Sequence, residues 1–165
     1  MDAGSRMRTA ILFIILGVGL LGAGTFVFGL GGVQAAPPVQ PKTVDLAAGE
    51  QLYSENCAAC HGENLEGQAN WQSAGPDGML PAPPHNERGH TWHHGDALLF
   101  NYTKLGGEAT LAVQGMEFKS GMPGFGETLT DQQIWDILAY IKSTWPDRVQ
   151  EVQAVRTEAE QLRGE

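Results

Sequence analysis

The sequence contains two cysteines, and both lie in the segment Cys57-Ala58-Ala59-Cys60-His61. Three ordinary kinds of site compete for such a pair. In a thiol–disulfide enzyme such a cysteine pair lies near a βαβ unit, and the sequence shows no sign of one. A zinc site needs two further ligands at suitable spacing. A structural disulfide would not require the histidine that follows. None of the three accounts for all five residues.

Covalent attachment of haem does account for them. Two residues between the cysteines let both thiols reach vinyl groups on neighbouring edges of one porphyrin, where each forms a thioether. The histidine directly after then lies under the iron as an axial ligand, and C-x-x-C-H is typical of c-type attachment. We therefore predict one covalent haem c, with Cys57 and Cys60 forming the thioethers and His61 binding the iron.

An uncharged segment near the N-terminus predicts export. Residues 10–33 are almost wholly apolar or glycine, which is long enough to span a bilayer at about 17–25 residues. Arg6 and Arg8 precede this segment, so the N-terminus is expected to stay in the cytoplasm. Residues 1–35 are either a retained transmembrane anchor or a signal peptide cleaved near Val33-Gln34-Ala35. The first alternative anchors the haem domain on the periplasmic face of a membrane, and the second releases a soluble periplasmic protein.

The charge of the chain excludes one class of partner. The formal net charge is −9, and residues 1–35 hold two positive residues and one negative, so the exported part carries −10. A nucleic-acid partner is excluded by this acidity. The charge serves either solubility or the steering of the domain toward a basic docking face.

The hydrophobic pattern of the exported part predicts helices and no strand, and hence an all-α fold. Asp45 is placed to cap the first helix, and Thr130 with Gln133 forms a capping box before the last. The three predicted helices cover Leu46–Asn56, Asp96–Leu105 and the segment between Thr130 and Pro146.

Residues 45–146 resemble a class I, monohaem c-type cytochrome of the membrane-anchored or exported bacterial type. In that family a first helix runs into C-x-x-C-H, and a middle helix, a methionine-bearing loop and a last helix follow. The resemblance implies a small all-α fold of three or more helices around one haem, in which the last helix crosses the first. Gly49 and Tyr53 resemble one side of this crossing, and Trp135, Leu138 and Tyr140 are candidates for the other.

We accordingly divide the chain into four parts. Residues 1–35 are the transmembrane anchor or signal peptide, residues 36–44 a Pro-rich linker, residues 45–146 the cytochrome c domain and residues 147–165 a charged C-terminal tail. Proline favours extended chain, so we expect the linker to hold the domain slightly off the membrane. The tail has few apolar residues. It either extends the third helix or stays disordered, and we expect disorder beyond about residue 155.

The resemblance also implies the remaining contacts of the haem iron. Residues 119–125 (KSGMPGF) resemble the family's methionine loop, which makes Met122 the second axial ligand. Met116 is the alternative, Met79 has no assigned role, and any methionine can simply fill a core. A proline carbonyl is implied as the acceptor for the other ring nitrogen of the axial histidine, and of Pro81, Pro83 and Pro84 the pattern favours Pro83.

Four histidines cluster in the segment HNERGHTWHH, which departs from an ordinary cytochrome c. They are His85, His90, His93 and His94. One interpretation is an exposed loop or partners for the haem propionates. A second is transient binding of copper or zinc, which imidazole suits. A third is an alternative haem ligand.

If His61 and Met122 both bind the iron, no position remains for a substrate, so we expect a single-electron carrier rather than an enzyme. Its expected partners are redox proteins, namely a quinol-oxidising complex, a dehydrogenase or a terminal oxidase. No small-molecule substrate is expected. The alternatives are a tethered haem subunit of a larger oxidoreductase complex, a haem-based ligand sensor, and a metal-handling protein that uses the histidine-rich loop.

Overall fold

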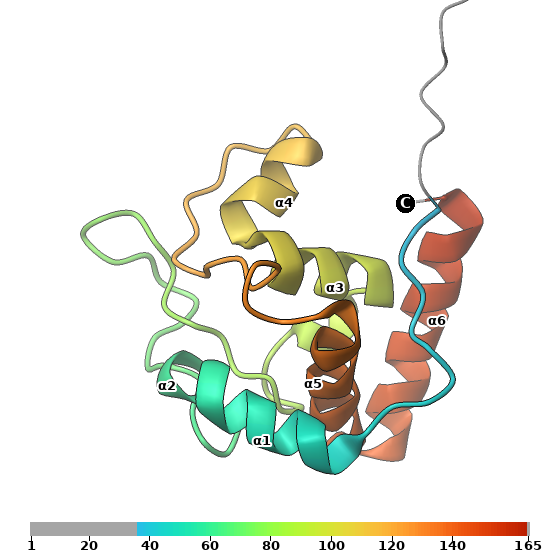
Figure 1. The fold of residues 1–165 in the computed structure, drawn as a ribbon. Coiled ribbons are helices and arrows are strands. Elements are labelled where there is room, and N and C mark those ends of the chain that lie inside the picture. Colours follow the sequence, from blue (N-terminus) through green and yellow to red (C-terminus); the bar gives the residue numbers. More distant parts are fainter. Residues whose placement is uncertain (1–35, 165) are drawn as a thin grey trace, which may run out of the picture. The chain divides into compact units, whose positions relative to one another are not determined.

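The computed structural model describes residues 36–164, and every regular element in this range is a helix (Figure 1). The elements are α1 (Leu46–Asn56), α2 (Ala58–His61), the 3-10 helix η1 (Thr91–His93), α3 (Asp96–Leu105), α4 (Gly107–Val113), α5 (Asp131–Ser143) and α6 (Asp147–Arg163). The all-α prediction is confirmed for this range. The predicted transmembrane or signal segment lies outside the described residues, and within them no helix has the length and apolar character to cross a bilayer.

α1 and α5 begin at the capping residues predicted from the sequence. Asp45 Oδ1 accepts hydrogen bonds of 3.0 Å from the backbone N–H groups of Ala47 and Ala48. Thr130 and Gln133 form the reciprocal capping box at the start of α5. These side chains satisfy N–H groups that have no partner within the helix. α1 and α3 have the predicted bounds, whereas α5 ends earlier than predicted, at Ser143.

α1 and α5 cross at a contact too close for a side chain (Figure 1). A Cβ atom at Gly49 would overlap the carbonyl oxygen of Asp136 on α5, so only glycine fits without displacing the backbone. The next turn of α1 carries Tyr53, whose ring centroid lies 5.6 Å from that of Tyr140. The crossing implied by the resemblance is confirmed for these residues.

The apolar core is organised around α5, which supplies half of its buried members. They are Tyr53, Leu65, Phe100, Leu129, Ile134, Trp135, Ile137, Leu138, Ile141 and Trp145. Trp135 was a candidate for the crossing with α1, but its ring stacks on Phe100 of α3 with the centroids 4.5 Å apart. α5 therefore joins α1 on one side to α3 on another.

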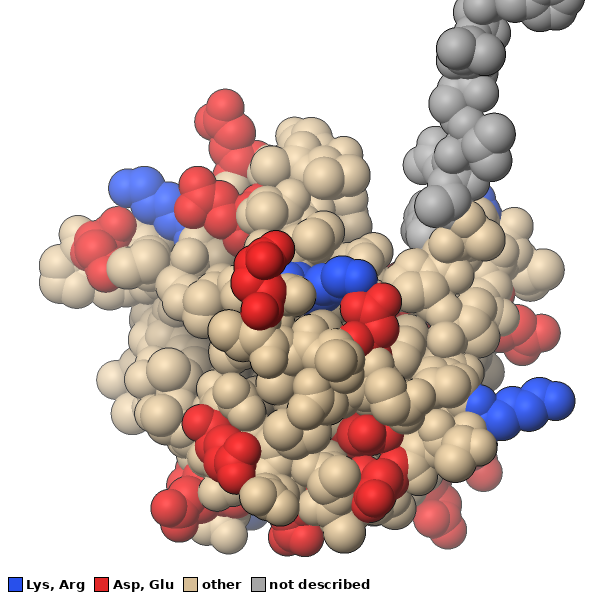
Figure 2. All heavy atoms as spheres, in the orientation of Figure 1, with Lys and Arg blue, Asp and Glu red and all other residues tan. Residues whose placement is uncertain are grey.

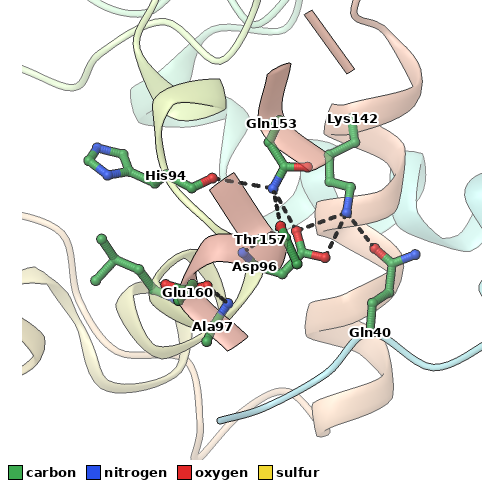
Figure 3. Close-up of polar contacts among 9 residues, drawn as sticks. Gln40, His94, Asp96, Ala97, Lys142, Gln153, Thr157 and Glu160 are labelled. Atoms are coloured by element: carbon green, nitrogen blue, oxygen red, sulfur yellow. Dashed lines mark hydrogen bonds and ion pairs between the residues drawn. The ribbon is translucent and has the colours of Figure 1, made fainter. Parts of the chain in front are cut away.

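The charged tail forms the helix α6, which corrects the expectation of disorder beyond residue 155. Its order comes from polar contacts with the start of α3 (Figure 3). Thr157 Oγ1 accepts a hydrogen bond of 3.1 Å from the backbone N–H of Asp96. The Glu160 carboxylate accepts two more, from the N–H groups of Ala97 at 2.8 Å and Leu98 at 2.9 Å. α6 thus supplies the N-terminal cap of α3.

The residue at the N-cap position of α3 explains why the cap comes from another helix. This residue is Gly95, which has no side chain with which to cap the helix. A Cβ atom at Gly95 would overlap the carboxylate of Glu160, so the glycine also makes room for the substitute cap.

A partly buried ion pair connects α3 and α5 next to this cap, and α6 joins it through Gln153 (Figure 3). Lys142 Nζ lies 2.9 Å from both carboxylate oxygens of Asp96, and Gln153 Nε2 donates to one of them at 2.7 Å. Lys142 Nζ also donates to Gln40 Oε1 in the linker at 2.8 Å. At this point the linker is held against α5.

We expect Glu160→Ala to lower the free energy of unfolding by about 2 kcal/mol, because two N–H groups at the start of α3 lose a charged acceptor. Chemical denaturation of the purified protein measures this loss. Glu158→Ala is the matched control, since Glu158 is exposed on the same helix and its removal should change the free energy by less than about 0.5 kcal/mol. Equal effects of the two substitutions would contradict the capping role.

Candidate functional site

α1 leads directly into the segment that carries both cysteines. Cys57 ends α1, with its N–H donating to Tyr53 O at 2.8 Å, and the single turn of α2 follows at once. Gly62 then ends α2 with a φ of +83°, a conformation that glycine adopts without strain. Neither cysteine is in a disulfide, and Cys57 is half-buried whereas Cys60 is exposed. The two thiols are therefore held one helical turn apart, beside His61.

His61 is buried, and its ring is fixed by one hydrogen bond. Its Nδ1 lies 2.8 Å from the carbonyl oxygen of Pro83. Because a carbonyl oxygen only accepts, Nδ1 carries the proton, and Nε2 is left as the nitrogen that can bind a metal. Of the three prolines considered from the sequence, Pro83 is confirmed as the acceptor. Burial lowers the pKa of His61, although the hydrogen bond to Pro83 opposes this, so the ring is neutral at neutral pH.

The Cys57 thiol is not activated for exchange. Burial, followed by the neighbouring charge of Cys60, raises its pKa to about 11. Reactive cysteines of thiol–disulfide enzymes have lowered pKa values instead. This difference argues against the redox-disulfide alternative.

The segment that carries Pro83 packs closely against the loop that follows α2. Gly67 has a φ of +68°, and a Cβ atom there would overlap the backbone of Pro83 and Pro84. The same glycine donates its N–H to His61 O at 2.7 Å. Gly67 therefore sets the distance between the histidine and its carbonyl acceptor.

The loop that carries Met122 is fastened to the C-terminal end of α3. The Met122 carbonyl accepts a hydrogen bond of 3.2 Å from Gly107 N, and Phe125 N donates to Thr103 O at 3.0 Å. A Cβ atom at Gly124 would lie 2.7 Å from the carbonyl of Leu105, so this glycine lets the loop pass close to the helix. The backbone on both sides of the methionine is thus fixed.

The three methionines of the described range differ in their surroundings. Met122 and Met79 are half-buried, whereas Met116 is 47% exposed. The Met79 sulfur lies 3.7 Å from the position that a Cβ atom would take on Gly121, next to Met122. A second thioether therefore lies beside the Met122 loop, which the sequence spacing did not reveal.

The rings of the histidine cluster have different neighbours, although those of His90 and His94 stay in contact with centroids 5.4 Å apart. The ring of His90 stacks on Trp71 with centroids 5.2 Å apart, and that of His93 stacks on Trp92 at 3.7 Å. Among residues 36–164, no group of three or more His, Cys, Asp or Glu side chains is arranged to hold a metal ion.

One member of the cluster lies at the candidate site itself. The rings of His85 and His61 are stacked, with their centroids 4.0 Å apart and their planes 21° apart. Sequence reasoning grouped the four histidines and missed this contact. The only signal for it is that His85 closely follows Pro83 in the chain.

The donor set suits a covalently attached haem. It consists of two free thiols for thioethers, a neutral buried imidazole with Nε2 available, and a thioether on a fixed loop. Soft thioether and imidazole donors are the pair that holds the iron of electron-transfer haems at high potential.

Comparison with known proteins agrees with this chemistry. Residues 46–145 match the family model for cytochrome c. The chain is 34% identical over 98 residues to cytochrome c6 of Gracilaria tenuistipitata var. liui, covering 59% of this chain and 70% of the relative. It is 28% identical over 103 residues to cytochrome c6 of Diacronema lutheri, covering 60% and 95%.

A third relative is part of a larger assembly. The Cbb3-type cytochrome c oxidase subunit CcoP of Azospirillum sp. (strain B510) is 33% identical over 97 residues, which cover 58% of this chain but only 27% of that subunit. No solved structure matches the chain. α6 begins after the last residue that the family model matches.

We expect Gly67→Ala to destabilise the protein more than Gly78→Ala. Both glycines have a positive φ, which costs an alanine about 1–2 kcal/mol. At Gly78 the nearest atom to an added Cβ is 3.9 Å away, whereas at Gly67 the Cβ would overlap the Pro83 segment. Urea unfolding of the two variants isolates the cost of this close approach, and equal midpoints would contradict it.

Proposed function

The chain belongs to the cytochrome c family, and on that premise we propose how its residues bind the haem and which partners it serves. As a monohaem class I c-type cytochrome it carries one covalent haem c and transfers electrons. We propose that Cys57 and Cys60 form the thioethers and that His61 and Met122 are the axial ligands. We also propose that residues 45–146 are the cytochrome c domain, with residues 1–35 an export signal or anchor.

The observation that carries this proposal is the hydrogen bond between His61 and Pro83. It is 2.8 Å long, it holds the proton on Nδ1, and it leaves Nε2 for the iron. A carbonyl acceptor of this kind orients a ligating histidine and raises its basicity. The two free thiols on the same short segment support covalent attachment at that position.

The Met122 loop supplies the opposite ligand in this proposal. A bound haem provides an iron that alternates between the ferrous and ferric states, and a methionine ligand raises its potential. The backbone contacts at Gly107 and Phe125 hold the loop in place. With protein ligands on both sides of the iron, no coordination position is left for a substrate, and the protein acts by transferring single electrons.

The surface supports encounters with basic partners. Figure 2 shows Asp and Glu side chains scattered over the visible face and few Lys or Arg side chains among them. The whole chain has a net charge of −9. Such a field accelerates association with a positively charged docking face. We propose a quinol-oxidising complex, a dehydrogenase or a terminal oxidase as the redox partner.

A second candidate function is that of a haem subunit within a larger oxidoreductase. The similarity to the CcoP subunit of a cytochrome c oxidase favours it, whereas the similarity to cytochrome c6 covers 95% of one such protein and favours an independent carrier. Extraction with a mild detergent distinguishes the two. Purification in a stable complex supports the subunit, and purification as a single chain supports the independent carrier.

We expect Met122→Ala to abolish the sulfur-to-iron charge-transfer band of the ferric protein. The midpoint potential should fall by more than about 59 mV, a tenfold change in the one-electron equilibrium, because the thioether favours ferrous iron. Optical spectra and redox titration measure both quantities. Met116→Ala and Met79→Ala are the controls, and loss of the band in either of them with its retention in Met122→Ala would reassign the ligand.

We expect the acidic surface to make the rates of electron transfer depend on ionic strength. Oxidation of the reduced protein by a cationic cobalt complex should slow as ionic strength rises from about 0.01 to 0.1 M, because the Debye length falls from about 30 to 10 Å. Oxidation by anionic hexacyanoferrate should accelerate over the same range. Stopped-flow measurements give both rates, and the same salt dependence for the two oxidants would contradict electrostatic steering.

A further inference from the structure

A second imidazole lies flat against the proposed axial ligand. We propose that His85 is a positioning residue, which stacks on His61 and fixes the plane of the ligand ring about its bond to the iron. This inference rests on the proposed role of His61. The contact that supports it is a near-parallel stack, with ring centroids 4.0 Å apart and an angle of 21° between the planes.

His85 is itself held by three hydrogen bonds. Its Nδ1 lies 2.8 Å from Thr91 Oγ1, and the Thr91 hydroxyl is 3.4 Å from the carbonyl of Pro84. If the single hydroxyl proton goes to that carbonyl, His85 Nδ1 is the donor to Thr91. The backbone of His85 accepts from Trp145 Nε1 at 2.6 Å and donates to Leu65 O at 2.9 Å. Ring and backbone are therefore both fixed.

The core packs against the same ring. The ring of Tyr53 meets that of His85 edge to face, with centroids 6.2 Å apart and planes at 72°. The Tyr53 hydroxyl donates to Gly62 O at 2.8 Å, in the residue that follows His61. His85 therefore lies in contact with both a core tyrosine on α1 and the proposed ligand.

The stack adds to the constraint that the hydrogen bond to Pro83 supplies. The ring turns about its Cβ–Cγ bond, and one hydrogen bond at Nδ1 tolerates a range of angles. A flat group against one face of the ring narrows this range. Contacts of this kind around a ligating histidine tune the metal, and a packed ring also keeps water away from the iron, which affects its potential.

α6 fastens the far end of the segment that carries His85. Gln153 Nε2 donates to the carbonyl of His94 at 3.2 Å, as Figure 3 shows. Trp145, just before α6, holds the near end through His85. The positioning contact is thus supported from both sides by the C-terminal part of the chain.

The test compares three variants of the haem-loaded protein by the EPR g-values of the ferric state and by midpoint potential. We expect His85→Ala to alter the g-values, because the plane of the His61 ring is released. We also expect it to lower the equilibrium constant for reduction of the iron about tenfold, which is a fall of about 59 mV in midpoint potential. His85→Phe keeps a flat ring and should retain the wild-type g-values. His93→Ala is the matched control, because His93 stacks on Trp92 and not on His61, and it should change neither quantity.

A milder variant keeps the test decisive if His85→Ala does not fold. Thr91→Val removes the hydroxyl that holds His85 Nδ1 and preserves the side-chain shape, so it should shift the g-values in the same direction by a smaller amount. Wild-type g-values and potential in His85→Ala, or in Thr91→Val where His85→Ala fails, would overturn the positioning role. A wild-type protein without a low-spin, histidine-ligated spectrum would instead overturn the proposed ligation by His61.

Discussion

The crossing of α1 and α5 at Gly49 is the contact on which the rest of the structure depends. The absence of a side chain lets the two backbones meet at the carbonyl of Asp136, and each helix then delivers part of the site from its C-terminal end. α1 ends at Cys57, the start of the attachment segment. Beyond the end of α5, Trp145 donates to the carbonyl of His85. One close approach of two helices therefore fixes the positions of the attachment segment and of the ring that stacks on His61.

Val149 in the first turn of α6 packs against the apolar core, and polar contacts hold the rest of the helix on the domain. Glu160 replaces the cap that Gly95 cannot supply, and Gln153 shares the buried carboxylate of Asp96 with Lys142. A buried charge is tolerable when it is paired and hydrogen-bonded, and both conditions hold for Asp96. The helix that follows the residues matched by the family model is thus part of the domain's structure.

Structural features set by neighbouring residues could be predicted from the sequence, whereas features set by contacts between distant segments could not. The bounds of α1 and α3 and the capping box of α5 follow from local side chains. α4 was missed because Gly106-Gly107 marks a helix end by composition, whereas Gly107 begins a new helix and bonds to the Met122 loop. The order of α6 and the stack of His85 on His61 arise from contacts between remote segments, and no local pattern encodes them.

The cap that α6 gives to α3 links the far C-terminal part of the described chain to the Met122 loop. Without Glu160, the first N–H groups of α3 would lack their carboxylate acceptor. The other end of α3 holds the Met122 loop, because Thr103 O accepts from Phe125 N. A truncation that removes the end of α6 would therefore reach the loop through α3.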